Sequence, residues 1–154
     1  MTNVKQFTKV KKLEGGRYLQ IETGFKEIPP MKSAKLGTKR HVVLTVEAVT
    51  FDSSHFLPDY DGTCGNLHGH TWHVNIKISG VIDNKTGMLV DFKTIKALIR
   101  DFDHTDLNCL IDIPTAENLA YLIGYTLQKQ LPKRCKVVMI QLYETENHCV
   151  EVNW

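Results

Sequence analysis

The stretch that decides the fold is His68-Gly-His-Thr-Trp-His-Val-Asn-Ile-Lys-Ile-Ser79. Its apolar residues occupy every second position, which is the period of a strand with one buried face. The β-branched run at residues 42–49 predicts an earlier strand that continues toward Phe51. A polar loop at residues 58–62 separates the two, so the sequence predicts a hairpin. The residues on the predicted buried face are Trp72, Val74, Ile76 and Ile78.

Two helices and two more strands follow this hairpin. Asp91 is a good N-cap for a helix whose apolar residues recur at helical spacing, from Phe92 to Phe102. The segment 114–118 begins a second helix, which ends before Pro132. Residues 135–143 and 148–154 predict the last two strands. This order indicates an α+β fold with an antiparallel four-stranded sheet and two helices on one face.

Charge divides the chain into two parts. Residues 1–40 carry ten Lys and Arg against three Glu, a net charge of +7. Residues 41–154 carry nine Lys and Arg against fourteen Asp and Glu, a net charge of −5. We therefore expect a basic N-terminal extension, 1–40, with a short edge strand at 18–25, and a folded domain, 41–154. The extension either packs on an acidic body or binds nucleic acid, and we favour packing.

Composition narrows the class of protein. The apolar fraction of 42% and the charged fraction of 23% are those of a soluble globular protein. No apolar stretch is long enough to cross a bilayer, and the first residues lack a secretory signal, so we expect a cytoplasmic protein without membrane partners. The four cysteines include no C-x-x-C pair and are expected to be free thiols.

Three histidines lie within sixteen residues: His55, His68 and His70. Residues i and i+2 of a strand project to the same face, so His68 and His70 can point at one ion. His55, near the end of the preceding strand, can supply a third nitrogen. Three imidazoles suit Zn²⁺ and leave one coordination position open, as in catalytic sites. The alternative is that these are unrelated core or surface histidines.

Cys64 stands just before this strand, where a nearby cation would favour its thiolate. Cys64 is either a reactive thiol or a fourth ligand that closes a structural zinc site. A second polar pair, Asp103 and His104, follows the first predicted helix. An Asp beside a His can orient the imidazole for proton transfer, but the pair is equally a helix C-terminal turn.

Six sequence blocks, spread over about three-quarters of the chain, resemble the family of 6-pyruvoyl-tetrahydropterin and 6-carboxytetrahydropterin synthases. They occur in the family's order, and six in series are specific although each is weak alone. Ser53 and Ser54 depart from the family's pair of small Ala residues. The blocks are Phe51-Asp-Ser-Ser-His-Phe-Leu57, Cys64-Gly-Asn-Leu-His-Gly-His70, Gly87-Met-Leu-Val-Asp-Phe92, Asp103-His-Thr-Asp-Leu-Asn108, Pro114-Thr-Ala-Glu-Asn118 and Tyr143-Glu-Thr145.

The resemblance implies the T-fold, or tunnelling fold, in which trimers close a barrel and two trimers commonly stack as a hexamer. It implies that the three histidines bind zinc, that Cys64 is the catalytic thiol, and that Asp103 and His104 relay protons. Glu144 matches the carboxylate that anchors the pterin ring. Thr115 and Glu117 either line the pterin pocket or belong to the first turn of a helix.

Spacing within the second block indicates the subgroup. Three residues separate Cys64 from His68, which resembles the 6-carboxytetrahydropterin synthases of the 7-deazaguanine (queuosine) pathway. The resemblance thus implies a zinc-dependent lyase that converts 7,8-dihydroneopterin triphosphate to 6-carboxytetrahydropterin, acetaldehyde and triphosphate. One alternative is a pyruvoyl synthase, which retains the three-carbon side chain. The other is a zinc-stabilised module that binds RNA without catalysis.

Overall fold

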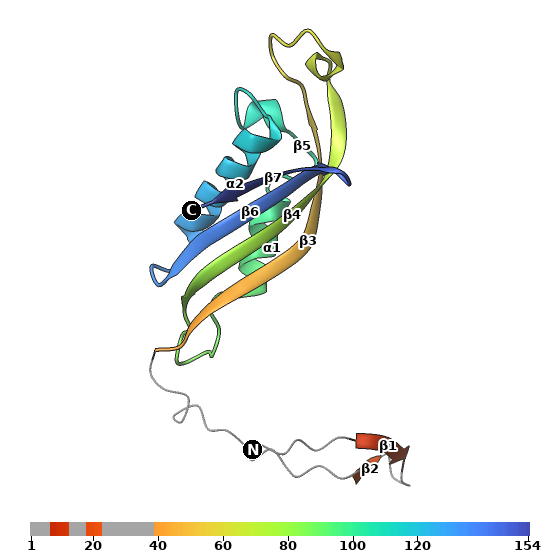
Figure 1. The fold of residues 1–154 in the computed structure, drawn as a ribbon, viewed down its shortest axis with the longest axis vertical. Helices are drawn as coiled ribbons and strands as arrows, with labels where there is room; N and C mark the ends of the chain where they lie inside the picture. Colours follow the sequence, from red (N-terminus) through yellow and green to blue (C-terminus); the bar gives the residue numbers. More distant parts are fainter. Residues whose placement is uncertain (1–6, 13–17, 23–38) are drawn as a thin grey trace. The chain divides into compact units, whose positions relative to one another are not determined.

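A long antiparallel hairpin dominates the computed structural model, which describes residues 7–12, 18–22 and 39–154 (Figure 1). Strand β3 (His41–His55) pairs with β4 (His68–Val81), in a register that places Phe51 opposite Trp72 and His55 opposite His68. Burial alternates along β4, with Trp72, Val74, Ile76 and Ile78 fully buried. The predicted alternation and the predicted hairpin are therefore confirmed.

The hairpin belongs to a five-stranded sheet of order β5-β3-β4-β6-β7. Strands β6 (Cys135–Thr145) and β7 (His148–Asn153) form the second antiparallel hairpin, and β6 pairs with β4. The prediction of four strands was one strand short, because the two-residue strand β5 (Thr105–Asp106) pairs in parallel with the edge of β3. A two-residue strand is too short to show periodicity in the sequence, so it is recognised only by its pairing with another strand.

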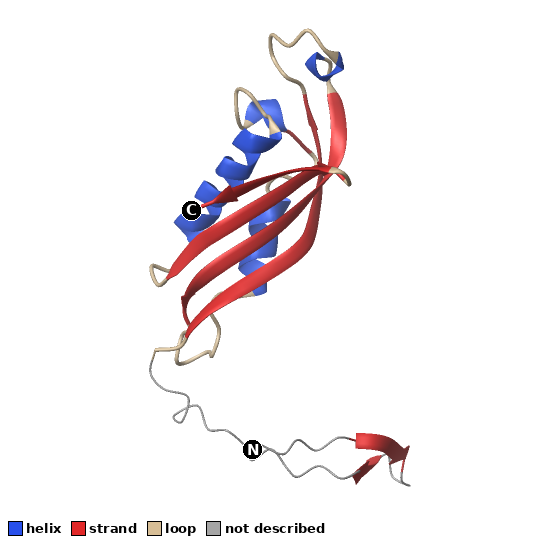
Figure 2. Cartoon of the chain, in the orientation of Figure 1, coloured by secondary structure: helices blue, strands red, loops and turns tan. Residues whose placement is uncertain are grey.

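Both helices lie on one face of this sheet, as predicted (Figure 2). Helix α1 (Phe92–Arg100) begins at Asp91, whose side chain accepts a hydrogen bond from the backbone N–H of Lys93. Helix α2 (Ala116–Gln130) begins at Thr115, whose side chain caps the Asn118 N–H. The prediction that Phe92 packs in the core was wrong, because this first residue of α1 is 53% exposed. The described residues 39–154 also contain two short 3-10 turns, Thr63–Gly65 and Leu107–Cys109.

The core lies between the helices and the covered face of the sheet. Strand residues Phe51 and Trp72 stack there with ring centroids 6.1 Å apart. Residues of both helices belong to the same core cluster, so the core includes side chains far apart in sequence. The largest fully buried helix side chains are Ile95, Leu98, Ile99, Leu119, Ile123 and Leu127.

The basic N-terminal segment forms a separate unit. The chain divides into the units Met1–Gly37 and Thr38–Trp154. Within the first, β1 (Phe7–Lys12) pairs antiparallel with β2 (Tyr18–Glu22). The expected strand at 18–25 thus exists over its first five residues, in a two-stranded sheet of its own, and its last three lie outside the described residues. No helix among the described residues is long and apolar enough to span a membrane.

Candidate functional site

The three histidines of the predicted metal site meet at the end of the β3–β4 hairpin. His55 and His68 are directly opposite each other across the two strands, with ring centroids 4.5 Å apart. The ring of His70, two residues along the same face of β4, lies 5.2 Å from that of His55. One ligand atom from each histidine can be chosen so that all three lie within 4.8 Å of one another. The structure therefore brings together three nitrogens that can hold a metal ion.

Backbone carbonyl groups orient two of these rings. The Nδ1 atom of His55 lies 2.8 Å from the carbonyl oxygen of Pro114, just before α2. The Nδ1 atom of His68 lies 2.8 Å from the carbonyl oxygen of Asn66. Because a carbonyl only accepts, each Nδ1 atom carries the proton and donates. Each Nε2 atom is then left with a lone pair, which is the usual arrangement in a metal-binding histidine.

The environment of His70 favours its neutral imidazole. Burial lowers the pKa of His70 below its ordinary value of 6.5, Glu144 opposes this shift, and His55 and His68 add to it. The Nε2 atoms of His55 and His70 are buried and have no hydrogen-bond partner in the described part of the chain. Leaving buried polar atoms unpaired is costly, and a bound cation would remove that cost. The donor set fits Zn²⁺, which imidazole nitrogens bind well.

Glu144 stands beside this histidine cluster, near the end of β6. Its Oε1 atom lies 3.5 Å from His55 Nε2 and 3.6 Å from His70 Nε2. Its side chain is about one-third exposed, whereas His55 is almost completely buried. The carboxylate that the family resemblance assigns to the pterin ring is therefore close to the candidate metal ligands.

Asp103 and His104 form the second polar pair, after α1. The Nδ1 atom of His104 lies 3.0 Å from Asp103 Oδ1. The same oxygen accepts a hydrogen bond of 2.9 Å from the backbone N–H of Asp52 on β3. This backbone N–H lowers the pKa of Asp103 below its ordinary value of 3.8, and the nearby His104 lowers it further. The Asp103 carboxylate is thus held ionised, in a position to orient the imidazole.

His104 has a left-handed backbone conformation, with φ of 56°. This region is uncommon for residues other than glycine, and it often marks functional turns. Its backbone N–H donates to the Asp52 carbonyl over 2.6 Å. The buried hydroxyl of Ser53 donates to the carbonyl of Phe102, on the other side of the pair. Two neighbouring residues of β3, Asp52 and Ser53, therefore hold the Asp103–His104 turn by hydrogen bonds.

Sequence reasoning missed several residues that support the site. Besides Ser53, these include Asn108, whose side chain exchanges hydrogen bonds of 2.9 and 3.0 Å with the backbone of Phe56. Asn108 thereby fixes the chain just after His55. Both Ser53 and Asn108 lie inside the quoted sequence blocks, which was the available signal. The carbonyls of Asn66 and Pro114 carry no sequence signal, since any residue supplies a carbonyl.

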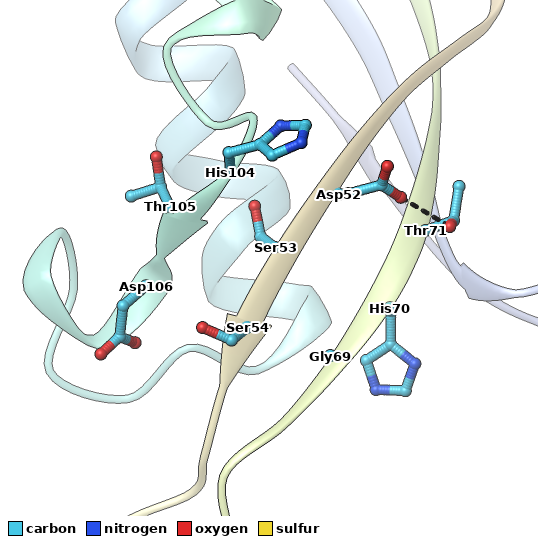
Figure 3. Close-up of a pocket in the computed structure, with 9 residues that line it drawn as sticks. All are labelled: Asp52, Ser53, Ser54, Gly69, His70, Thr71, His104, Thr105 and Asp106. Atoms are coloured by element: carbon cyan, nitrogen blue, oxygen red, sulfur yellow. Dashed lines mark hydrogen bonds between the residues drawn. The ribbon is translucent and has the colours of Figure 1, made fainter.

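An open cavity of about 530 Å³ lies at the edge of the sheet, where β3, β4 and β5 meet (Figure 3). His70 and His104 both line it, so the cavity connects the two polar clusters. The Asp52 carboxylate in its wall accepts a hydrogen bond of 2.6 Å from the hydroxyl of Thr71. The remaining lining residues are Ser53, Ser54, Gly69, Thr105 and Asp106.

The other predicted site residues lie outside this lining. Cys64 is a half-buried free thiol on the Thr63–Gly65 turn, four residues before His68 in the chain. Thr115 serves as the N-cap of α2, with its side-chain oxygen 3.3 Å from the Asn118 backbone nitrogen. Glu117 is exposed in the first turn of α2. The structure accounts for Thr115 as a helix cap, and the pterin-binding roles of Thr115 and Glu117 stay predictions.

Comparisons with known proteins show the family of the chain. The family model of 6-pyruvoyl tetrahydropterin synthase matches residues 44–153. A dihydroneopterin monophosphate aldolase from Pyrococcus furiosus is 32% identical over 109 residues, covering 68% of this chain and 92% of the relative. A putative 6-carboxy-5,6,7,8-tetrahydropterin synthase from Archaeoglobus fulgidus is 33% identical over 109 residues, covering 68% of this chain and 90% of the relative.

A solved structure shows the same fold. The 6-pyruvoyl tetrahydropterin synthase of Caenorhabditis elegans superposes with a TM-score of 0.61 at 21% identity, covering 75% of this chain and 96% of its own. This likeness confirms the predicted T-fold. The family model covers most of the chain, including all three clustered histidines and Glu144. The chain therefore belongs to the 6-pyruvoyl tetrahydropterin synthase family.

Proposed function

We propose that this protein is a zinc-dependent 6-carboxytetrahydropterin synthase that acts on 7,8-dihydroneopterin triphosphate. The observation that carries the proposal is the cluster of His55, His68 and His70, with two Nε2 atoms buried and unpartnered. The spacing of three residues between Cys64 and His68 supports the 6-carboxytetrahydropterin product. The Archaeoglobus fulgidus relative, whose name includes this activity, supports the same product.

The three histidines would hold the zinc ion, which supplies Lewis acidity to the hydroxyl groups of the substrate's side chain. Glu144 binds the pterin ring, because a carboxylate accepts two parallel hydrogen bonds from its guanidine-like edge. This interaction fixes the ring so that the side chain points toward the histidine cluster. Binding and orientation of this kind supply much of the rate enhancement of an enzyme.

Proton transfer falls to Cys64, Asp103 and His104. The thiolate of Cys64 takes a proton from a side-chain carbon, and the C–O bond to triphosphate breaks in the elimination. His104, charged and oriented by Asp103, returns protons to the rearranging side chain. Hydrolytic cleavage of the resulting diketone consumes one water and leaves a carboxylate on the ring, with acetaldehyde as the second product.

The substrate's phosphates need cations from outside the described cavity. Two carboxylates, Asp52 and Asp106, line this cavity, and no Lys or Arg of residues 39–154 does. We propose that a neighbouring copy of the chain, in a trimer or hexamer, supplies the positive charge. The His104 side chain is 80% exposed in the single chain, so it is open to a neighbouring copy.

Mass spectrometry of the product tests the proposal. The zinc-loaded protein, incubated with 7,8-dihydroneopterin triphosphate, is expected to release acetaldehyde and a pterin that keeps one side-chain carbon as a carboxylate. A dicarbonyl pterin with three side-chain carbons would instead show a pyruvoyl synthase. A product of carbon–carbon cleavage formed from the monophosphate would show the activity named for the Pyrococcus furiosus relative.

The Cys64→Ala variant separates catalysis from a structural zinc module. We expect this variant to retain zinc at unchanged stoichiometry while turnover is lost, because the thiol moves protons and does not hold the metal. Loss of zinc together with the thiol would identify a closed structural site. In that case RNA binding that disappears on deletion of residues 1–40 would support the non-enzymatic module.

A further inference from the structure

Glu144 occupies an irregular position in its strand. The register between β6 and β7 shifts between Tyr143 and Thr145, so Glu144 is the extra residue of a β-bulge. Bulges often redirect a side chain next to an active site. Here the side chain points at the histidine cluster, with its Oε1 atom 3.5 Å from His55 Nε2 and 3.6 Å from His70 Nε2. The carboxylate thus approaches two candidate metal ligands at once.

These contacts are not hydrogen bonds. His55 donates from Nδ1 to the Pro114 carbonyl, so in its neutral form its Nε2 atom presents a lone pair. The facing oxygen of Glu144 also presents lone pairs. The two atoms lie 3.5 Å apart, so a cation between them would contact both the imidazole and the carboxylate.

The separations agree with a single metal centre. Zinc binds imidazole nitrogen and carboxylate oxygen at about 2.0–2.2 Å, so two neighbouring ligands of a tetrahedral ion lie about 3.3–3.5 Å apart. The distances from Glu144 Oε1 to the two nitrogens, 3.5 and 3.6 Å, are close to this range. With His68, whose ligand atom lies within 4.8 Å of those of His55 and His70, these groups offer three nitrogens and one oxygen, the number of donors that a tetrahedral ion takes.

We propose that Glu144 is a fourth metal ligand in the substrate-free protein and that it leaves the metal when a pterin enters. The second part rests on the proposed function, in which the same carboxylate binds the pterin ring. Glu144 would then open the coordination position only when substrate is present to take its carboxylate. An empty active site would keep its metal fully coordinated and tightly bound.

Zinc affinity tests the first part. Competition with a chromophoric chelator is expected to show that Glu144→Gln, which is isosteric but neutral, binds Zn²⁺ at least about tenfold more weakly than the unaltered chain. Replacing groups that merely support metal ligands already costs about 10–100-fold. The matched control is Glu146→Gln, an exposed carboxylate two residues along, which should leave the affinity unchanged. Equal affinities for the two variants would overturn the proposal.

Visible absorption of the Co²⁺-substituted protein tests ligand exchange without measuring turnover. We expect the spectrum of Glu144→Gln to differ from that of the unaltered chain, and the spectrum of Glu146→Gln to superpose on it. Adding neopterin to the unaltered chain should change its spectrum, because the carboxylate leaves the metal. A spectrum of Glu144→Gln identical to that of the unaltered chain would refute the fourth ligand. If neopterin leaves the spectrum of the unaltered chain unchanged, the proposed ligand exchange is refuted.

The two proposals fail in different ways. A changed Co²⁺ spectrum with a product other than 6-carboxytetrahydropterin would leave the fourth ligand standing and remove the proposed activity. Formation of 6-carboxytetrahydropterin, together with an unchanged Co²⁺ spectrum and zinc affinity in Glu144→Gln, would leave the proposed activity standing and remove the fourth ligand. The spectrum of the unaltered chain needs no variant, so it remains informative even if Glu144→Gln folds poorly.

Discussion

The two ends of the β3–β4 hairpin use the same strand face for different purposes. At one end the face is apolar and lies under the helices, where Trp72, Val74 and Ile76 have no exposed surface. At the other end, beyond the last residue that pairs with β6, the same face of β4 carries His68 and His70. One alternation therefore positions both the core and the candidate metal ligands.

The apolar end of the hairpin contributes stability, and the histidine end carries the candidate metal ligands. The packed end buries apolar side chains, whose removal from water stabilises the domain. The histidine end contains two buried nitrogen atoms that have no hydrogen-bond partner among the described residues, and a bound cation would remove the cost of burying them. Trp72 is the boundary, since its ring lies 5.3 Å from His55 and 5.5 Å from His70. Rigid packing on one side of this ring holds the donor atoms on the other.

Removal of the boundary residue should have the largest effect. Trp72→Ala is expected to lower the free energy of unfolding by about 3–5 kcal/mol, because a fully buried ring leaves a cavity. It should also weaken zinc binding, since two ligand rings lose their support. Urea denaturation of metal-free protein and chelator competition measure the two effects. Ile78→Ala, at the far end, should lower stability alone, and weakened zinc binding in that variant would contradict the separation.

Removal of a donor should affect only the histidine end. Zinc at a hundred times its dissociation constant is expected to stabilise the unaltered chain by about 2.7 kcal/mol and His68→Ala by almost nothing. Thermal unfolding with and without zinc measures this difference. His73→Ala is the matched control. His73 lies on the same strand, where it pairs with Tyr143, but on the opposite face from His68 and His70. Equal stabilisation of both variants by zinc would exclude the histidine cluster as the metal site.

Ser53 connects the strand to the Asp103–His104 turn. Ser53→Ala should lower the free energy of unfolding by about 1–3 kcal/mol, because the buried Phe102 carbonyl loses its hydrogen bond. Zinc stoichiometry should be unchanged, since the hydroxyl faces the turn and not the cluster. Denaturant unfolding checks the first expectation and metal analysis the second. The adjacent Ser54→Ala should change stability by less than about 0.5 kcal/mol, and a loss equal to that of Ser53→Ala would contradict this role.

The smallest expected effect is the acid dependence of Asp103. Its pKa is lower in the folded protein than its ordinary value of 3.8, so near that pH the unfolded chain binds more protons. The stabilisation by the carboxylate is therefore present above this value and disappears as pH falls through the lower, folded pKa. Asp103→Asn should be less stable than the unaltered chain at about pH 5, and the difference should shrink toward about pH 2. Acid unfolding followed by circular dichroism measures it, and a constant difference would contradict the shift.

Most of the main sheet could be predicted because its patterns are local. Period-two alternation located β4, and the N-cap Asp91 and the segment 114–118 marked where the two helices begin. Strand β5 could not be predicted, because its pairing depends on the position of β3 and not on its own two residues. Strand β1 was missed because its lysines interrupt the apolar pattern. The exposure of Phe92 depends on what covers the end of α1, which helical spacing does not reveal.

The candidate site divides in the same way. The i, i+2 rule paired His68 with His70, and the hairpin register brought His55 opposite His68. The position of Glu144 beside the cluster was not predictable, because it depends on a bulge and on contacts between distant strands. The backbone carbonyl of Pro114, which fixes the His55 ring, leaves no trace in residue identity.

The most direct test of the central claim is a zinc titration of the metal-free protein, with turnover of 7,8-dihydroneopterin triphosphate measured at each step. We expect no turnover without metal and a rate that rises until the histidine cluster is filled, then stays constant. We also expect His68→Ala to show no rise under the same conditions. Full turnover by the metal-free chain, or an undiminished rise in His68→Ala, would contradict a catalytic zinc held by His55, His68 and His70.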